Sequence, residues 1–221
     1  MKISVLIPTK NEPLINELIE QINKVLKNFK HEIIVIDKSD ITPNIRNAKL
    51  IVQKSDGLGK AVLEGLAYAT GDVIITMDGD FSHDPNDLLK LIEKTNDYDV
   101  VVGSRFVYSG TTEDVTYRKF ISFLFRKFAS LILGLNVKDS MSGFVVVRKY
   151  VYKKLKLSPI GYKINMEIMF KAKKKNYKIC EVPITFHRRK AGTSKAGISL
   201  SGFNEGMRVI RYVFELKLGL R

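Results

Sequence analysis

Two acidic residues separated by one glycine form the strongest chemical signal in the sequence. Asp78 and Asp80 flank Gly79 directly after residues 74–77, an apolar run typical of a buried strand. Carboxylates at positions i and i+2 beyond a strand end can both reach a hard divalent cation, and Gly79 would let the backbone approach a ligand. We therefore predict a divalent-cation site, with an ordinary acidic turn as the alternative interpretation.

Further polar residues end a second predicted strand or open a predicted helix. Asp37 ends the strand expected at residues 31–37, and in a parallel sheet we expect it beside Asp78, with a turn residue as the alternative. Gly59 and Lys60 open a predicted helix. In one interpretation, the first N–H groups of this helix and Lys60 bind an anion, and in the other the glycines before the helix only form its cap. These residues extend the predicted site along one edge of a sheet.

The elements that must position these residues alternate between strand and helix in the first half of the chain. The expected strands are at residues 3–7, 31–37, 49–53, 72–77 and 98–103, and the expected helices are at 14–26, 59–69 and 86–95. This alternation predicts an α/β fold with a mostly parallel sheet covered on both faces. Ligands bind beyond the carboxyl ends of such strands, where the acidic residues cluster.

The second half departs from simple alternation. We expect helices at residues 116–135, 163–175 and 202–218, and strands at 143–147 and 178–186. The first and last of these helices are amphipathic, with apolar arcs opposite basic residues such as Arg126 and Arg211. Such helices lie in a membrane interface or pack on the sheet with a solvated basic face, and the sequence favours neither interpretation over the other.

Length and charge indicate one globular domain that attracts phosphate. The chain has 221 residues, and its 37 Lys and Arg outnumber 23 Asp and Glu to give a net charge of +14. This charge attracts nucleic acid, a nucleotide or an anionic membrane surface, and by itself it does not choose among them. Basic residues concentrate after Arg105, so we expect the second half to face the phosphate or the membrane.

Cysteine usage and hydropathy favour a cytoplasmic protein that does not span a membrane. Cys180 is the single cysteine, and the start lacks the basic and then apolar pattern of a secretory signal. No run approaches the roughly 18 to 20 apolar residues that cross a bilayer. The histidines at positions 31, 83 and 187 are too scattered to predict a zinc site, and we assign them no role.

The order of short motifs resembles the family 2 glycosyltransferases of GT-A fold. In the first half these motifs are Pro8-Thr-Lys-Asn-Glu12, Val35-Ile-Asp37, Gly57-Leu-Gly-Lys-Ala61, Asp78-Gly-Asp80 and Gly103-Ser-Arg105. In the second half they are Asp139-Ser-Met-Ser-Gly143, Gly161-Tyr-Lys-Ile, Glu181-Val-Pro-Ile-Thr-Phe-His-Arg-Arg189 and Gly192-Thr-Ser-Lys195. The second set resembles the polyprenyl-phosphate branch, most closely the dolichyl-phosphate mannosyltransferases.

The resemblance implies a role for individual residues. Asp80 coordinates Mg²⁺ or Mn²⁺ on a diphosphate, Asp78 lies near the ribose and the metal, and Ser82 stands where the family commonly has a metal-contacting Gln. The residues implied in binding the phosphates of donor and acceptor are Arg105, Arg118, Arg189 and Lys195. The other implied substrate-binding positions are Pro8, Lys10, Glu12, Asp37, Asp56, Gly59, Lys60, Gly79, Ser142 and Lys163.

Three positions depart from the family pattern. Lys10 replaces a residue that is often Tyr, so base stacking there is not expected to follow the family. Lys38 replaces the second acid of a frequent Asp-Asp pair, and Ser82 is a weaker metal ligand than Gln. These departures bear on the identity of the nucleotide and leave the arrangement of metal and diphosphate intact.

The resemblance implies an inverting enzyme that moves mannose from GDP-mannose to dolichyl phosphate on the cytoplasmic face of a membrane. Residues up to about 105 would form a nucleotide-binding half, and residues 106–221 an acceptor-binding half. Because a lipid phosphate is already ionised at pH 7, the sequence needs no strong general base. The alternatives are another donor such as UDP-glucose, a non-catalytic sugar-nucleotide sensor, and an RNA-binding module that rests on the net charge alone.

Overall fold

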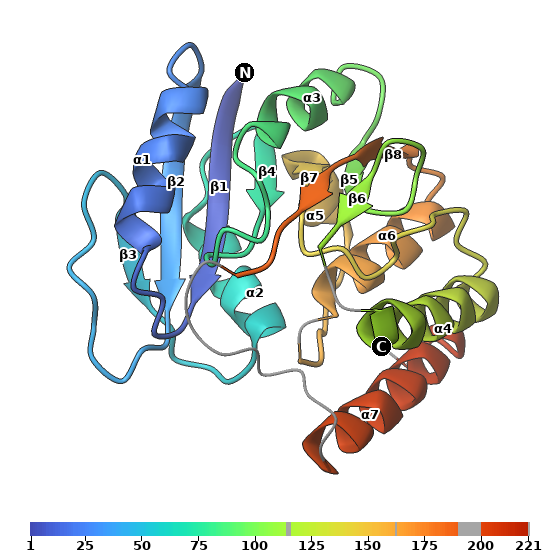
Figure 1. The fold of residues 1–221 in the computed structure, drawn as a ribbon. Helices are drawn as coiled ribbons and strands as arrows, with labels where there is room; N and C mark the ends of the chain where they lie inside the picture. Colours follow the sequence, from blue (N-terminus) through green and yellow to red (C-terminus); the bar gives the residue numbers. More distant parts are fainter. Residues whose placement is uncertain (114–115, 162, 190–199, 221) are drawn as a thin grey trace.

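A seven-stranded sheet forms the centre of the molecule (Figure 1). The computed structural model describes residues 1–113, 116–161, 163–189 and 200–220, and it describes only the backbone at 116–122 and 200–205. The strands follow the order β3 (Lys49–Val52), β2 (Lys30–Asp37), β1 (Lys2–Thr9), β4 (Val73–Thr76), β7 (Val145–Arg148), β5 (Val100–Ser104) and β8 (Ile179–Pro183). All neighbouring pairs are parallel except those that β7 makes.

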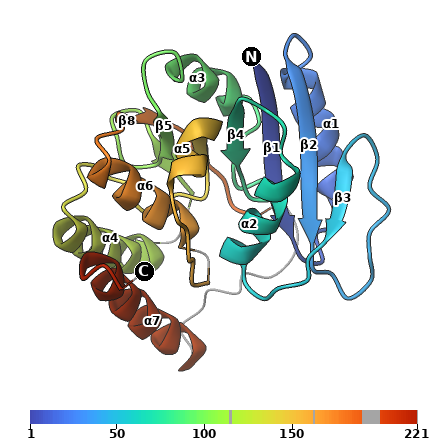
Figure 2. The same ribbon diagram turned by 180° about the vertical axis from the view of Figure 1, so that it is seen from behind.

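Helices cover both faces of this sheet, as the alternating pattern predicts (Figures 1 and 2). One face carries α1 (Ile15–Val25) and α3 (Asp87–Lys94), and the other carries α2 (Leu58–Tyr68), α5 (Lys149–Lys154) and α6 (Ile164–Lys174). Side chains alternate along β1, so that Val5 and Ile7 pack under α1 while Leu6 packs on the opposite side. The predicted α/β fold with a mostly parallel sheet is confirmed.

The antiparallel strand β7 is the main feature that the sequence pattern does not reveal. Val145, its first residue, pairs with Thr76 of β4 and with Val102 of β5. Because β7 runs against its neighbours, it begins where β4 and β5 end. The residues that precede β7 therefore lie at the carboxyl edge of the parallel strands, beside the predicted site.

The strand order corrects one expectation about the site. Asp37 was expected beside Asp78, but β1 lies between β2 and β4. Thr9 is the residue that pairs with Asp37 in the sheet, and its hydroxyl donates a hydrogen bond of 2.8 Å to the Asp37 carboxylate. The spacing of strands in the sequence does not define their order in the sheet, so this neighbour relation could not be derived from the pattern.

The second half adds a pair of long helices and a small second sheet. Helix α4 (Thr116–Leu133) packs against α7 (Leu200–Lys217), and the rings of Phe128 and Phe214 lie 6.0 Å apart (Figure 2). The strand predicted at residues 178–186 is divided into β8 and β9 (Thr185–Phe186), and β9 pairs with β6 (Thr111–Thr112). Helix α5 and strand β6 were not predicted.

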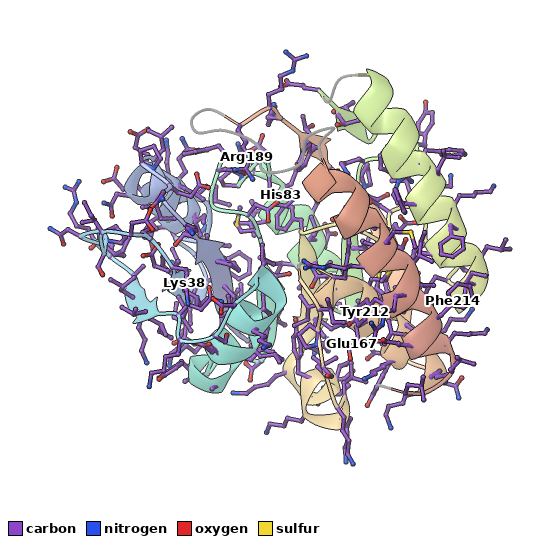
Figure 3. All side chains as sticks on the ribbon, turned by 90° about the horizontal axis from the view of Figure 1, so that it is seen from below. Lys38, His83, Glu167, Arg189, Tyr212 and Phe214 are labelled. Atoms are coloured by element: carbon purple, nitrogen blue, oxygen red, sulfur yellow. The ribbon has the colours of Figure 1, made fainter. Side chains whose placement is uncertain are left out.

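A buried carboxylate connects α7 to the body of the molecule (Figure 3). Glu167 of α6 has no exposed surface and accepts a hydrogen bond of 2.7 Å from the Tyr212 hydroxyl of α7. It also accepts the backbone N–H of Ser158 at 2.9 Å and pairs with Lys171 at 2.6 Å. The Tyr212 contact fixes α7 against α6 in addition to its packing on α4, and the other two contacts hold the buried carboxylate in place.

The two amphipathic helices bury one apolar side and expose another. Tyr212 and Val213 of α7 are buried, whereas Phe214 is 45% exposed, and Leu131 of α4 is 78% exposed. Arg126 was expected on a solvated basic face, but it is buried because its guanidinium stacks on Phe106 and donates to a backbone carbonyl. Within the described part of the chain, the helices are too short or too polar to cross a membrane.

Candidate active site at the carboxyl edge of the sheet

The turn that follows β4 presents the two predicted metal-binding acids. Asp80 is 6% exposed, and its Oδ1 accepts the backbone N–H of Ser82 at 3.0 Å. A Cβ atom on Gly79 would lie 2.7 Å from Cγ2 of Thr9. Gly79 is thus required by the close packing of the turn on the end of β1, and the approach of a ligand at Gly79 stays a prediction.

The two carboxylates lie close enough to influence each other. About a third of the Asp78 side chain, 35%, is exposed. Burial raises the pKa of Asp78, and the Asp80 carboxylate adds to the rise, whereas the positive charges of Arg189 and Arg105 oppose it. A cation placed between these acids would favour their ionised forms, so the turn has the electrostatic character of a cation site.

Arg189 joins the acidic turn to a segment from the far end of the chain (Figure 3). Its Nε lies 2.6 Å from Oδ2 of Asp80, and its Nη1 lies 3.6 Å from Oε1 of Glu12. The ends of β1 and β4 and the segment after β9 therefore meet at one point. The structure brings together three predicted site residues that are widely separated in the sequence.

Arg105 is held by a buried carboxylate on the other side of the turn. Its Nε and Nη2 donate to the two oxygens of Asp139 at 2.8 and 2.9 Å, and Asp139 is fully buried. Glu181 in turn accepts the backbone N–H groups of Lys138 and Asp139 at 2.7 and 2.9 Å. Asp139 and Glu181 belong to the motifs quoted above but were not predicted as site residues. The signal that could have found Asp139 is its presence in the same set of motifs as Arg105, because an aspartate can bind an arginine through both carboxylate oxygens.

These features coincide with a known protein family. The sequence model described as "Glycosyl transferase family 2" matches residues 4–156. The chain belongs to glycosyl transferase family 2. This family 2 glycosyltransferase is 38% identical over 214 residues to a "Dolichol-phosphate mannosyltransferase" of Pyrococcus furiosus. The alignment covers 88% of this chain and 59% of that protein.

A second relative is also named as a mannosyltransferase that acts on a polyprenyl phosphate. The chain is 34% identical over 154 residues to an "Undecaprenyl-phosphate mannosyltransferase" of Micrococcus luteus, over 66% of the chain and 63% of that protein. The family 2 glycosyltransferase thus spans about three fifths of the length of the relatives that it matches.

Solved structures support the fold. Glucosyl-3-phosphoglycerate synthase of Mycobacterium tuberculosis, in complex with Mn²⁺, UDP and phosphoglyceric acid, superimposes with a TM-score of 0.75 at 20% identity. The match covers 99% of this chain and 78% of the synthase. A second structure of that synthase, with Mg²⁺ and UDP, has a TM-score of 0.74 at 18% identity. This match covers 99% of this chain and 79% of the synthase chain. The expected GT-A fold is confirmed.

In this family 2 glycosyltransferase, the predicted residues at the end of β2 and the start of α2 differ in burial and partners. Asp37 is buried at the end of β2, and Lys38 pairs with Asp56 at 3.1 Å (Figure 3). Lys60 is exposed on α2, but the N–H of Gly59 donates to the carbonyl of Gly161 at 2.6 Å. The Gly59 N–H is thus paired within the protein, and anion binding by the other N–H groups at the start of α2 and by Lys60 stays a prediction.

Ser142 and Lys163 lie inside the molecule. The Ser142 hydroxyl donates to the Gly103 carbonyl at 2.6 Å and accepts the Phe144 N–H at 3.1 Å, so it connects the end of β5 with the start of β7. Lys163 is 5% exposed, and its Nζ lies 3.6 Å from the Met141 sulfur. Both side chains are buried, and their predicted contact with substrate stays a prediction.

The other predicted residues flank this centre or lie outside the described parts. Pro8 is half-buried in β1, Lys10 is exposed just beyond that strand, and Ser82 is buried. The backbone of residue 118 belongs to α4, but the side chain of Arg118 lies outside what the structure describes. Lys195 lies outside the described residues altogether.

The donor set of the turn fits a divalent cation that shares its ligands with a substrate. Among the residues that the structure describes, no group of three or more His, Cys, Asp or Glu side chains could hold a metal alone. Mg²⁺ commonly binds proteins through one or two carboxylates and takes further ligands from phosphates and water. Asp78 and Asp80 supply those two carboxylates, with the partly exposed Asp78 facing outward.

Proposed function

We propose that this protein transfers mannose from a nucleotide sugar, with GDP-mannose favoured, to dolichyl or another polyprenyl phosphate. The observation that carries the proposal is the meeting of Arg189 and Asp80 at 2.6 Å. This contact supports the proposal because a guanidinium suits phosphate binding and the adjacent carboxylate suits a cation on the diphosphate. The relatives' names, which specify mannosyl transfer and polyprenyl phosphates, support the choice of sugar and acceptor.

The residues of the turn and the arginines have complementary tasks in this reaction. Asp78, Asp80 and Ser82 would hold Mg²⁺ or Mn²⁺, which supplies charge neutralisation for the departing diphosphate when bound. Arg189 binds the acceptor phosphate and draws it toward the anomeric carbon. The acceptor phosphate is ionised at neutral pH, so its oxygen attacks directly and inverts the configuration without a protein base.

Arg105 has a more restricted task than the sequence suggested. Because both oxygens of Asp139 hold its guanidinium, it contributes positive charge to the site from a fixed place. The first 105 residues would form the nucleoside site around Pro8, Lys10, Glu12 and Asp37, bordered by Asp56, Gly59 and Lys60. Residues 106–221 would form the acceptor site of the same domain, with Arg118, Ser142, Lys163 and Lys195.

The location proposed for this reaction is the cytoplasmic face of a membrane. Leu131, Met207 and Phe214 are exposed on α4 and α7, and Arg208 and Arg211 are exposed on α7. Exposed apolar side chains beside basic ones suit an interface with anionic lipid. This surface would bring the acceptor site close to a lipid-anchored phosphate.

A donor panel tests the proposal directly. The protein is incubated with labelled GDP-mannose, UDP-glucose or UDP-N-acetylglucosamine, with dolichyl phosphate and with Mg²⁺, Mn²⁺ or a chelator, and then extracted into organic solvent. We expect label in the organic phase from GDP-mannose and only with metal. Organic label from UDP-glucose instead would replace the donor, and binding of a nucleotide sugar without transfer from any donor would indicate a sensor.

A further inference from the structure

His83 lies directly behind the acidic turn, where three segments of the chain meet (Figure 3). Its side chain is 2% exposed, and its Nδ1 accepts the backbone N–H of Asp78 at 3.1 Å. Its ring packs against Phe144 and Phe186, with centroids 4.9 and 5.4 Å away. One side chain therefore contacts the turn, the approach to β7 and strand β9.

The hydrogen bond defines the chemical state of this imidazole. An Nδ1 that accepts an N–H carries no proton, so the ring is neutral and its Nε2 carries the hydrogen. The Asp78 carboxylate lies 3.8 Å from Nδ1, beyond hydrogen-bond distance.

The turn that His83 closes needs external support. Phe81 has a φ of 63°, in the left-handed region that residues with a side chain rarely adopt. Such a conformation persists where the surrounding contacts fix it. The contact from His83 to Asp78 and the contact from Ser82 to Asp80 close the loop on either side of Phe81.

The same residue connects the turn to the segment that carries Arg189. His83 forms an antiparallel bridge with Phe186, and the N–H of His187 donates to the Ser82 carbonyl at 2.9 Å. Arg189 follows two residues later and reaches Asp80. The acidic turn and the basic segment are thus joined by backbone contacts centred on His83.

We propose that His83 is a positioning residue that holds the two carboxylates in place for a divalent cation and holds Arg189 in register with them. It acts through its Nδ1 acceptor and its packing, and it touches no substrate. The inference rests on the cation site proposed for Asp78 and Asp80.

Two substitutions separate the acceptor from the bulk of the ring. His83→Leu keeps a buried apolar side chain but removes the acceptor, whereas the Oδ1 of His83→Asn can replace Nδ1. Affinity for Mn²⁺ alone is measured on the full chain by electron paramagnetic resonance. Since a hydrogen bond contributes roughly 1 kcal/mol, we expect affinity to fall about three- to tenfold in His83→Leu and to stay within about twofold in His83→Asn.

A second histidine provides the matched control. His31 is half-buried at the start of β2, where it contacts Phe29 and Asn23 through hydrogen bonds of 2.9 and 2.8 Å. His31→Leu should lower the thermal stability but leave the Mn²⁺ affinity unchanged. Equal losses in His83→Leu and His83→Asn, or a folded His83→Leu with wild-type affinity, would overturn the positioning role.

Hydrogen exchange of the turn keeps this test independent of the metal. Amide exchange across residues 77–82 should be faster in His83→Leu by about three- to tenfold and near wild type in His83→Asn and His31→Leu. If the wild type and Asp80→Asn bind Mn²⁺ equally, the cation site fails, while the exchange pattern still decides the role of His83. Unchanged exchange in His83→Leu would refute that role.

Discussion

The acids and the bases of the candidate site are positioned in different ways. Asp37 and Asp80 accept hydrogen bonds from within residues 1–105: from Thr9 on the adjacent parallel strand, and from the N–H of Ser82 two residues away. Arg105 and Arg189 are held by carboxylates from distant parts of the chain. The acids therefore have hydrogen-bond support within residues 1–105, whereas the two arginines depend on ion pairs that connect residues 1–105 with residues 106–221.

The largest expected effect comes from removing the negative charge of Asp80. Asp80→Asn keeps the shape of the turn but loses the negative charge needed by a cation, so we expect transfer to fall by at least about a thousandfold, which corresponds to several kcal/mol of transition-state stabilisation. The melting temperature should change little. Steady-state transfer by the purified variant is the measurement.

A carboxylate away from the site serves as the control for this loss. Asp97 is exposed beyond α3, and Asp97→Asn should transfer at the wild-type rate. Near-normal turnover by a folded Asp80→Asn protein would exclude the cation assignment.

Replacing Arg189, the ion-pair partner of Asp80, tests the role of the arginines. Arg189→Ala should slow transfer about ten- to a hundredfold while nucleotide-sugar affinity changes little, because a charge-assisted phosphate contact contributes roughly 1.5 to 3 kcal/mol. Arg189→Lys should recover part of the rate, since an ammonium keeps the charge but not the two-pronged geometry. Donor affinity and maximal rate are measured on the same samples.

The adjacent arginine makes a matched comparison. Arg188 is exposed, and its Nε donates to the Glu113 backbone carbonyl at 3.0 Å. Arg188→Ala removes the same charge and should change the rate less than about threefold. A large loss of donor affinity with an unchanged maximal rate in Arg189→Ala would show that Arg189 only holds the donor.

The same contrast explains what the sequence could predict. The strands that end at Asp37 and Asp78, and the helices between them, follow from local apolar periodicity. The order of the strands, the reversed direction of β7 and the pairing of Arg105 with Asp139 depend on contacts between distant segments, which no local pattern encodes. His83 escaped notice because its function depends on a loop that returns to Asp78 and on rings at positions 144 and 186.

A stability measurement tests the framework of residues 106–221 separately from the candidate site. Tyr212→Phe removes the hydroxyl that binds the buried Glu167 carboxylate, so the free energy of unfolding in urea should fall by about 1.5 to 3 kcal/mol. Tyr68→Phe, at a ring that is 47% exposed, should change it by less than about 0.5 kcal/mol. A loss that is equal in both variants would contradict the anchoring of α7 through Glu167.

The smallest effect concerns the exposed apolar surface of α4 and α7. Leu131 is 78% exposed, so Leu131→Asn should cost little folding stability but weaken binding to phosphatidylserine vesicles by about three- to tenfold, as expected for roughly 1 kcal/mol of lost apolar burial. Vesicle co-sedimentation at low and high salt measures this, and the binding should weaken with salt, because the basic residues nearby contribute through electrostatics. Ile41 is 85% exposed in the loop between β2 and β3, and this loop lies at the other end of the sheet from α4 and α7 (Figure 1). Ile41→Asn should therefore leave vesicle binding unchanged, and an equal loss in both variants would show that the protein adheres to lipid through no particular face.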